Sequence, residues 1–216
     1  MAMCAAGRAG PCGARVFARR SVSYTEVGTT RWGRRVSILK IRLLGDPILR
    51  QKGRRITPEQ LKSVSTQRLI DDMIETMRDA RGVGLAAQQV GQPLKLLVIE
   101  HGYVKEGADP LILVNGELVK CTGPYMVDEG CLSVPGYRGE IERCMRIVAK
   151  GLDRNGKEYR IRATEFLAQA VQHEIDHTNG ILFVDHLESP DHLYRLAPDE
   201  HAAEGVVQDG PELHTI

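Results

Sequence analysis

Apolar positions recur at two different periods along the chain, and the period separates expected helices from expected strands. Between Thr57 and about Arg81 the apolar residues are spaced three and four apart, which predicts an amphipathic helix. Thr57, Pro58 and Gln60 are typical of a helix start, because they supply an N-cap, a proline at the first helical position and a capping-box partner. Gly82 then favours a stop.

A second stretch of helical period runs from Thr164, the expected N-cap, to Asn179, and Gly180 is expected to end it. Between the two helices, apolar and β-branched runs are bounded by Gly, Pro, Asn and Asp and therefore predict strands. These runs cover residues 94–100, 111–114, 117–121, 145–151 and 158–162, with a hairpin turn at 153–156. Residues 37–44 predict a short extended segment.

This order of elements predicts the fold class. Strands gathered between two helices, without strand–helix–strand alternation or an internal repeat, indicate an α+β domain with largely antiparallel sheets. The second helix is expected at its centre, with the first as an N-terminal helix. No apolar run approaches the length of a membrane span, so no membrane partner is expected.

Charge divides the chain into three parts. Residues 1–35 hold seven arginines and one acid, and we expect them to be a disordered extension, either a transit peptide or a dispensable segment. Residues 36–187 form the expected domain, and 188–216 an acidic tail. The domain itself is near neutral, so no nucleic-acid groove is expected.

The cysteines number five and are irregularly spaced, which is not typical of a secreted disulfide framework. A reducing compartment fits better. Cys121 and Cys144 lie on predicted strands and are interpreted as small buried apolar side chains. Cys131 lies beside a glycine in a predicted loop, so it is not interpreted as a small buried apolar side chain.

The second helix contains the motif H-E-x-x-H at residues 173–177. Positions four apart share a helix face, so His173 and His177 can reach one metal ion with Glu174 beside it. The alternative is an accidental motif on a solvated helix. A helix carrying these groups near its apolar stripe would be costly to bury without a partner for them.

Two further segments stand out. Residues 82–89, GVGLAAQQ, form a glycine-punctuated loop that lacks the Lys-Ser/Thr ending of a phosphate loop. Its small residues permit close approach of a ligand to the backbone. Residues 129–133, EGCLS, place Cys131 in a loop.

Taken in order, GVGLAAQQ, EGCLS and QHEIDH resemble the three motifs of the peptide deformylase family, and residues 45–50 resemble its N-terminal motif. The resemblance covers residues 37–187. It implies that N-formylmethionyl nascent peptides are the substrate and that Cys131, His173 and His177 hold one divalent metal. Fe²⁺ is the expected ion, and Zn²⁺, Ni²⁺ or Co²⁺ are possible with these ligands.

Three protein ligands leave a fourth position of a tetrahedral ion open, which is typical of a catalytic site. Glu174 is expected to take a proton from water and return it to the leaving amine. The resemblance implies that the Gln89 side-chain amide and the backbone N–H of Leu132 stabilise the oxyanion.

The substrate is a peptide end, so an exposed backbone edge at Val83 and Gly84 is expected to bind it as an added strand. Glu129 is assigned to the substrate site and, with Arg143, forms either a supporting ion pair or an exposed pair that contributes little. Asp176 either orients a metal histidine or faces solvent. The positions matching the family's methionine pocket are Val83, Val127, Phe166, Gln169 and Ala170, of which Gln169 is unexpectedly polar.

Two other function classes remain open from the sequence. A zincin-type metalloprotease also uses H-E-x-x-H and takes a third ligand downstream, for which His186 is available. An inactive ribosome-associated module would keep the fold without turnover. For an active deformylase we expect work near the ribosome exit region in the bacterial cytoplasm, or in a mitochondrion or plastid if residues 1–35 are a transit peptide.

Overall fold

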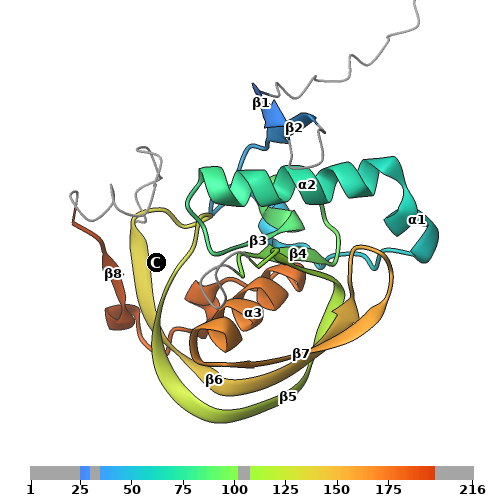
Figure 1. Ribbon diagram of the computed structural model, residues 1–216. Helices are drawn as coiled ribbons and strands as arrows, with labels where there is room; N and C mark the ends of the chain where they lie inside the picture. The colour runs from blue at the N-terminus through green and yellow to red at the C-terminus, as the bar shows by residue number, and fades with distance from the viewer. Residues whose placement is uncertain (1–24, 30–34, 102–107, 198–216) are drawn as a thin grey trace, which may run out of the picture.

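The computed structural model describes residues 25–29, 35–101 and 108–197, and Figure 1 shows their arrangement. A six-stranded sheet in the order β3-β4-β5-β6-β7, with β8 added beside β6, curves around helix α3. Every strand pair in it is antiparallel, which confirms the expected mixed fold with an antiparallel sheet. Its strands are β3 (Gly84–Ala86), β4 (Leu96–Ile99), β5 (Leu111–Gly130), β6 (Tyr137–Leu152), β7 (Glu158–Thr164) and β8 (Leu193–Arg195).

The first expected helix is two helices. α1 (Pro58–Lys62) begins with the predicted capping box on Thr57 and Gln60, and α2 (Val64–Asp79) follows. Ser63 is extended between them and its hydroxyl accepts a hydrogen bond from the backbone N–H of Thr66. The prediction of one continuous helix is therefore wrong, because this serine caps a new helix.

β5 and β6 form a long hairpin that the sequence divided into shorter strands. The expected break near residue 115 is a bulge in one continuous strand. The predicted turn at 153–156 connects β6 to β7, with Gly156 at φ +86°. The hairpin matters for function because Cys131 directly follows β5.

Helix α3 (Glu165–Thr178) and the sheet enclose one apolar cluster, and α2 closes a second one against β3 and β4. The α3 cluster includes Val171 and Ile175 from the helix and Ala149 and Ile161 from the sheet. α3 ends where predicted: Gly180 has φ +79°, and a Cβ there would lie 2.5 Å from the Arg50 carbonyl oxygen. This packing fixes the polar face of α3 beside the end of β5.

Both ends of the described chain differ from expectation. β1 (Thr25–Thr29) pairs with β2 (Arg35–Ile38), so at these positions the expected disordered extension is wrong. Residues 1–24 and 30–34 lie outside the described residues. In the expected acidic tail, the short 3-10 helix Pro190–His192 leads into β8, which pairs with β6 because its backbone completes an open edge. Residues 198–216 lie outside the description.

Cys121 and Cys144 form a disulfide between β5 and β6. The interpretation of these residues as separate buried apolar side chains is wrong, because β5 and β6 bring their Cα atoms to 5.5 Å from each other, although neither is the direct partner of the other in the strand register. Cysteine spacing along the sequence carries no information about that register. Among the described residues, no helix is both long and apolar enough to cross a bilayer.

Candidate metal centre

Three side chains converge at the end of β5 and the polar face of α3. His173 and His177 lie one turn apart on α3, and their Nε2 atoms are 3.2 Å from each other. Cys131 Sγ lies 3.2 Å from His177 Nε2, and the three donor atoms all lie within 4.8 Å of one another. The structure therefore brings together the three residues that the sequence assigned to a metal.

The donor set fits a divalent ion of borderline softness. Two imidazole nitrogens and one thiolate are typical ligands of zinc, iron, cobalt and nickel, and unlike an all-oxygen set they do not suit magnesium or calcium. The convergence of Nε2 from both histidines leaves Nδ1 of each ring pointing away from the common centre. This arrangement suits ligation through Nε2.

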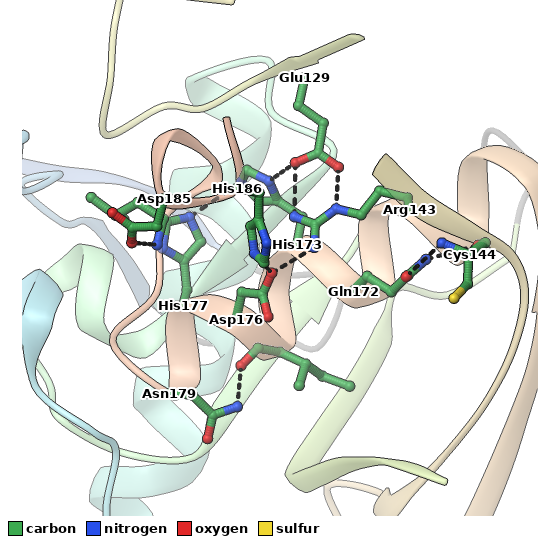
Figure 2. Close-up of polar contacts among 12 residues, drawn as sticks. Glu129, Arg143, Cys144, Gln172, His173, Asp176, His177, Asn179, Asp185 and His186 are labelled. Carbon is green, nitrogen blue, oxygen red and sulfur yellow. Dashed lines mark hydrogen bonds and ion pairs between the residues drawn. The ribbon is translucent and has the colours of Figure 1, made fainter. Parts of the chain in front are cut away.

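His173 is oriented by a buried carboxylate, as Figure 2 shows. Its Nδ1 lies 2.7 Å from Glu129 Oε2, and Arg143 donates to both oxygens of the same carboxylate at 2.8 and 3.0 Å. Burial alone would raise the pKa of Glu129, but the bonds from His173 and Arg143 outweigh it and lower the pKa to about 2. Glu129 is therefore an ionised partner of His173.

The Glu129–Arg143 pair is buried, with side chains 2% and 5% exposed, so the alternative of a solvated surface pair is wrong. Arg143 also donates to Asp176 Oδ2 at 2.6 Å, so Asp176 does not merely face solvent. The Nε2 of His186 lies 2.8 Å from that same oxygen. His186 is therefore not part of the metal-binding cluster found among the described residues, and its Nε2 contacts Asp176 instead.

Glu174 is buried beside the ligands and stands apart from these ion pairs. It is 4% exposed, and its Oε2 has no hydrogen-bond partner among the described residues. Burial raises its pKa to about 7. Gly84 of β3 lies against it, since a Cβ at that position would come within 2.7 Å of Glu174 Cδ.

The two histidines have opposite pKa shifts. Burial lowers the pKa of His173, but hydrogen bonds with Cys131 and Glu129 prevail and raise it well above the ordinary value. Burial lowers the pKa of His177 well below that value, and the adjacent His173 adds to the effect. His177 is therefore neutral, with a nitrogen lone pair available for a metal.

Gln89 faces the cysteine from the 3-10 helix Ala87–Val90. Its Oε1 accepts a hydrogen bond from the Ala86 N–H at 2.8 Å, which fixes the amide so that Nε2 points toward Cys131 Sγ at 3.5 Å. Nε2 also donates to the Ser133 hydroxyl at 3.2 Å. Ser133, fully buried, was not singled out from the sequence, although its place two residues after Cys131 is the signal that could have found it.

A cavity of about 660 Å³ opens onto these groups and is bounded by β3, the loop after β5 and the start of α3. Gln89, Leu132 and Glu174 all line it. The predicted substrate residues on its wall are Val83, Gly84, Glu129, Phe166, Gln169 and Ala170. Val127 is not on the wall. Like Cys131, it packs against the apolar cluster that contains Phe183. The segment with Leu39, Ile41 and Leu43 also lines the cavity and was predicted only as an extended segment.

The polar side chain of Gln169 is accommodated at the cavity rim. Its Nε2 donates to the Asp128 carbonyl oxygen at 3.1 Å. One N–H of this amide is therefore paired with a backbone carbonyl. Beside it, β3 is the last strand of the sheet and pairs only with β4 among the described strands, so its other edge is available to an extended peptide.

Residues 38–192 match the family model described as polypeptide deformylase. Among curated relatives, a peptide deformylase from Dehalococcoides mccartyi strain CBDB1 is 47% identical over 171 residues, covering 79% of this chain and 99% of the relative. One from Halothermothrix orenii is 50% identical over 148 residues, covering 68% and 92%.

Solved structures agree with these relatives. A Legionella pneumophila peptide deformylase superposes with a TM-score of 0.64 at 41% identity, covering 77% of this chain and 90% of that one. A Synechococcus elongatus peptide deformylase in complex with actinonin gives a TM-score of 0.67 at 38% identity, covering 71% and 83%.

Proposed function

Because the chain belongs to the polypeptide deformylase family and is a metal-dependent hydrolase that removes the formyl group from N-formylmethionine of new proteins, we propose that Cys131, His173 and His177 hold its metal. The observation that carries this assignment is the convergence of one sulfur and two Nε2 atoms within 4.8 Å. We propose ferrous iron as the resident ion, with zinc, nickel or cobalt compatible with the same donors. When bound, the ion supplies a Lewis acid that polarises the formyl carbonyl and lowers the pKa of the attacking water.

Glu174 is the proposed proton carrier. Its carboxylate lines the cavity, has an unpartnered oxygen and has a pKa near 7, which suits a group that must both accept and release a proton at neutral pH. Glu174 takes the proton of the attacking water and delivers it to the amine that leaves as the C–N bond breaks. The products are formate and a free methionine amine.

Two groups are the proposed donors that stabilise the oxyanion: one is on the 3-10 helix Ala87–Val90 and the other is in the loop after β5. The Gln89 amide is held by the Ala86 N–H and aims its Nε2 at the ligand cluster, and the backbone N–H of Leu132 comes from the loop that carries Cys131. Donors fixed before the reaction need not reorganise when charge develops. The Glu129 carboxylate keeps His173 oriented throughout.

The peptide is proposed to extend along the open edge of β3 at Val83 and Gly84. The methionine side chain enters the apolar part of the cavity near Phe166 and Ala170, while Gln169 closes its rim. We also propose 36–187 as the catalytic domain around α3, action near the ribosome exit region, and a cytoplasmic location.

The test uses protein prepared without oxygen and loaded with ferrous iron. A formyl-methionyl peptide should release formate, whereas the same peptide with a free amine should remain intact; cleavage of its internal peptide bonds would favour a protease. The Cys131→Ala protein should lose metal and formate release together, since two histidines leave the ion under-coordinated. Full metal content in that variant would refute the ligand assignment.

A further inference from the structure

The orienting contacts of His173 continue beyond Glu129 to the end of the domain. Arg143 binds Glu129 with Nε and one terminal nitrogen, and its other terminal nitrogen donates to Asp176. Asp176 Oδ2 in turn lies 2.8 Å from Nε2 of His186. Figure 2 shows the resulting series His186, Asp176, Arg143, Glu129 and His173.

The series joins four elements of the chain, beginning with Glu129 on β5 and His173 on α3. His186 belongs to the 3-10 helix Phe183–His186, which follows the turn at Gly180, while Arg143 lies on β6 and Asp176 on α3. Exposure of the side chains rises along it, from 2% for Glu129 and 5% for Arg143 to 15% for Asp176 and 34% for His186. His186 is therefore the solvent-side end of a buried polar chain that reaches a metal ligand.

The planar guanidinium of Arg143 explains why its second partner matters. Its N–H bonds have fixed directions, so a carboxylate on each of two edges sets the rotation of the group. Removing Asp176, or letting it turn away, frees one edge and loosens the fork that holds Glu129. One oxygen of Asp176 serves both Arg143 and His186, so the imidazole limits how that carboxylate can turn.

We propose that Asp176 and His186 are positioning residues for the metal centre, acting through Arg143 and Glu129 to hold His173 with Nε2 directed at the ion. This inference rests on the proposed function, because it presumes that His173 is a metal ligand. Neither residue touches the cavity. Their effect should therefore appear in metal affinity before it appears in substrate binding.

The experiment measures Co²⁺ affinity by competition with a chelator, together with the visible absorption of the bound cobalt and the Tm of the metal-free protein. His186→Leu removes the donor to Asp176, and we expect about a 3- to 10-fold weaker affinity, toward the low end of losses on removing outer partners of ligands. His186→Gln keeps an N–H at similar reach and should restore affinity to within about 2-fold of the parent. Asp176→Asn should lose about 10-fold or more.

His192→Leu is the matched control, since this histidine lies in the next 3-10 helix and outside the series. It should leave cobalt affinity and spectrum unchanged. The proposal is overturned if His186→Leu binds cobalt like the parent, if His186→Gln loses as much as His186→Leu, or if each loss merely follows a drop in Tm. Unchanged cobalt binding in Cys131→Ala would instead refute the ligand set, so the two failures are distinguishable.

Discussion

Glu129 and Glu174 are both buried next to His173, yet their surroundings give them opposite properties. Glu129 receives bonds from His173 and Arg143, and its pKa falls to about 2. Glu174 has an oxygen without a partner among the described residues, and burial raises its pKa to about 7. Burial alone does not decide the charge of a carboxylate; the donors around it do.

The difference corresponds to two kinds of work. A side chain that fixes a ligand must stay charged and still, so its bonds are complete. A side chain that carries a proton must change charge during the reaction, and complete bonds to its ionised form would oppose that change. In the proposed mechanism these demands fall on two residues, Glu129 at the end of β5 and Glu174 on the polar face of α3.

Removing the charge of Glu129, the carboxylate that receives the hydrogen bonds, should have the largest effect on stability. Glu129→Gln leaves the buried Arg143 with Asp176 as its remaining charged partner, so the metal-free protein should lose about 3–4 kcal/mol in free energy of unfolding, toward the low end for a broken buried pair. Urea unfolding measures it. Glu117→Gln is the control, because Glu117 pairs with Arg55 at the surface and should change stability by about 0–1 kcal/mol. Equal losses in both variants would contradict the account.

The pH dependence of stability sharpens the comparison. The pKa of Glu174 rises from 4.5 to about 7 on folding, so the folded metal-free protein binds more protons than the unfolded chain and loses stability as pH rises through that range. The pKa of Glu129 falls from 4.5 to about 2, so its contribution is present above pH 4.5 and is lost as pH falls toward 2.

Glu174→Gln should abolish the loss of stability that the parent shows as pH rises from 4.5 to about 7, and should leave the loss at low pH from Glu129 unchanged. Above pH 7 the metal-free variant should be more stable than the parent by about 3 kcal/mol, from roughly 1.36 kcal/mol per pKa unit. Urea unfolding of both proteins at several pH values gives the difference, in which the other titrating groups cancel. A parent and variant with parallel pH profiles would show that Glu174 is not destabilised by burial.

Gly84→Ala tests Glu174, the carboxylate with an unpartnered oxygen, by crowding it. The new Cβ would come within 2.7 Å of Glu174 Cδ, so the carboxylate must shift, and we expect about 1–3 kcal/mol of lost stability with reduced formate release. Gly130→Ala is the control for stability alone, because its Cβ would meet nothing closer than 3.5 Å. If both variants behave alike, close packing of Gly84 on Glu174 is unimportant.

The sequence predicts local structure well where one short stretch contains the whole cause. The capping box at Thr57, the end of α3 at Gly180 and the spacing of His173 and His177 are such cases. The family resemblance adds Cys131, which spacing alone could not place beside them.

Features that depend on distant contacts were missed. The disulfide depends on how β5 and β6 pack against each other, and no local pattern encodes that packing. The contact between Asp176 and His186 needs the turn after α3 to fold back. Val127 packs against a neighbouring apolar cluster and does not line the cavity, so its place in the methionine pocket stays a prediction.

The central claim is that Glu174 carries the proton without holding the metal. The most direct measurement is the metal content and formate release of Glu174→Gln, prepared beside the parent with the same ion. The account predicts full metal content and a turnover reduced by about 10²- to 10⁴-fold, because an amide cannot accept the proton of water. A metal-free variant, or one that releases formate at close to the parent rate, would contradict it.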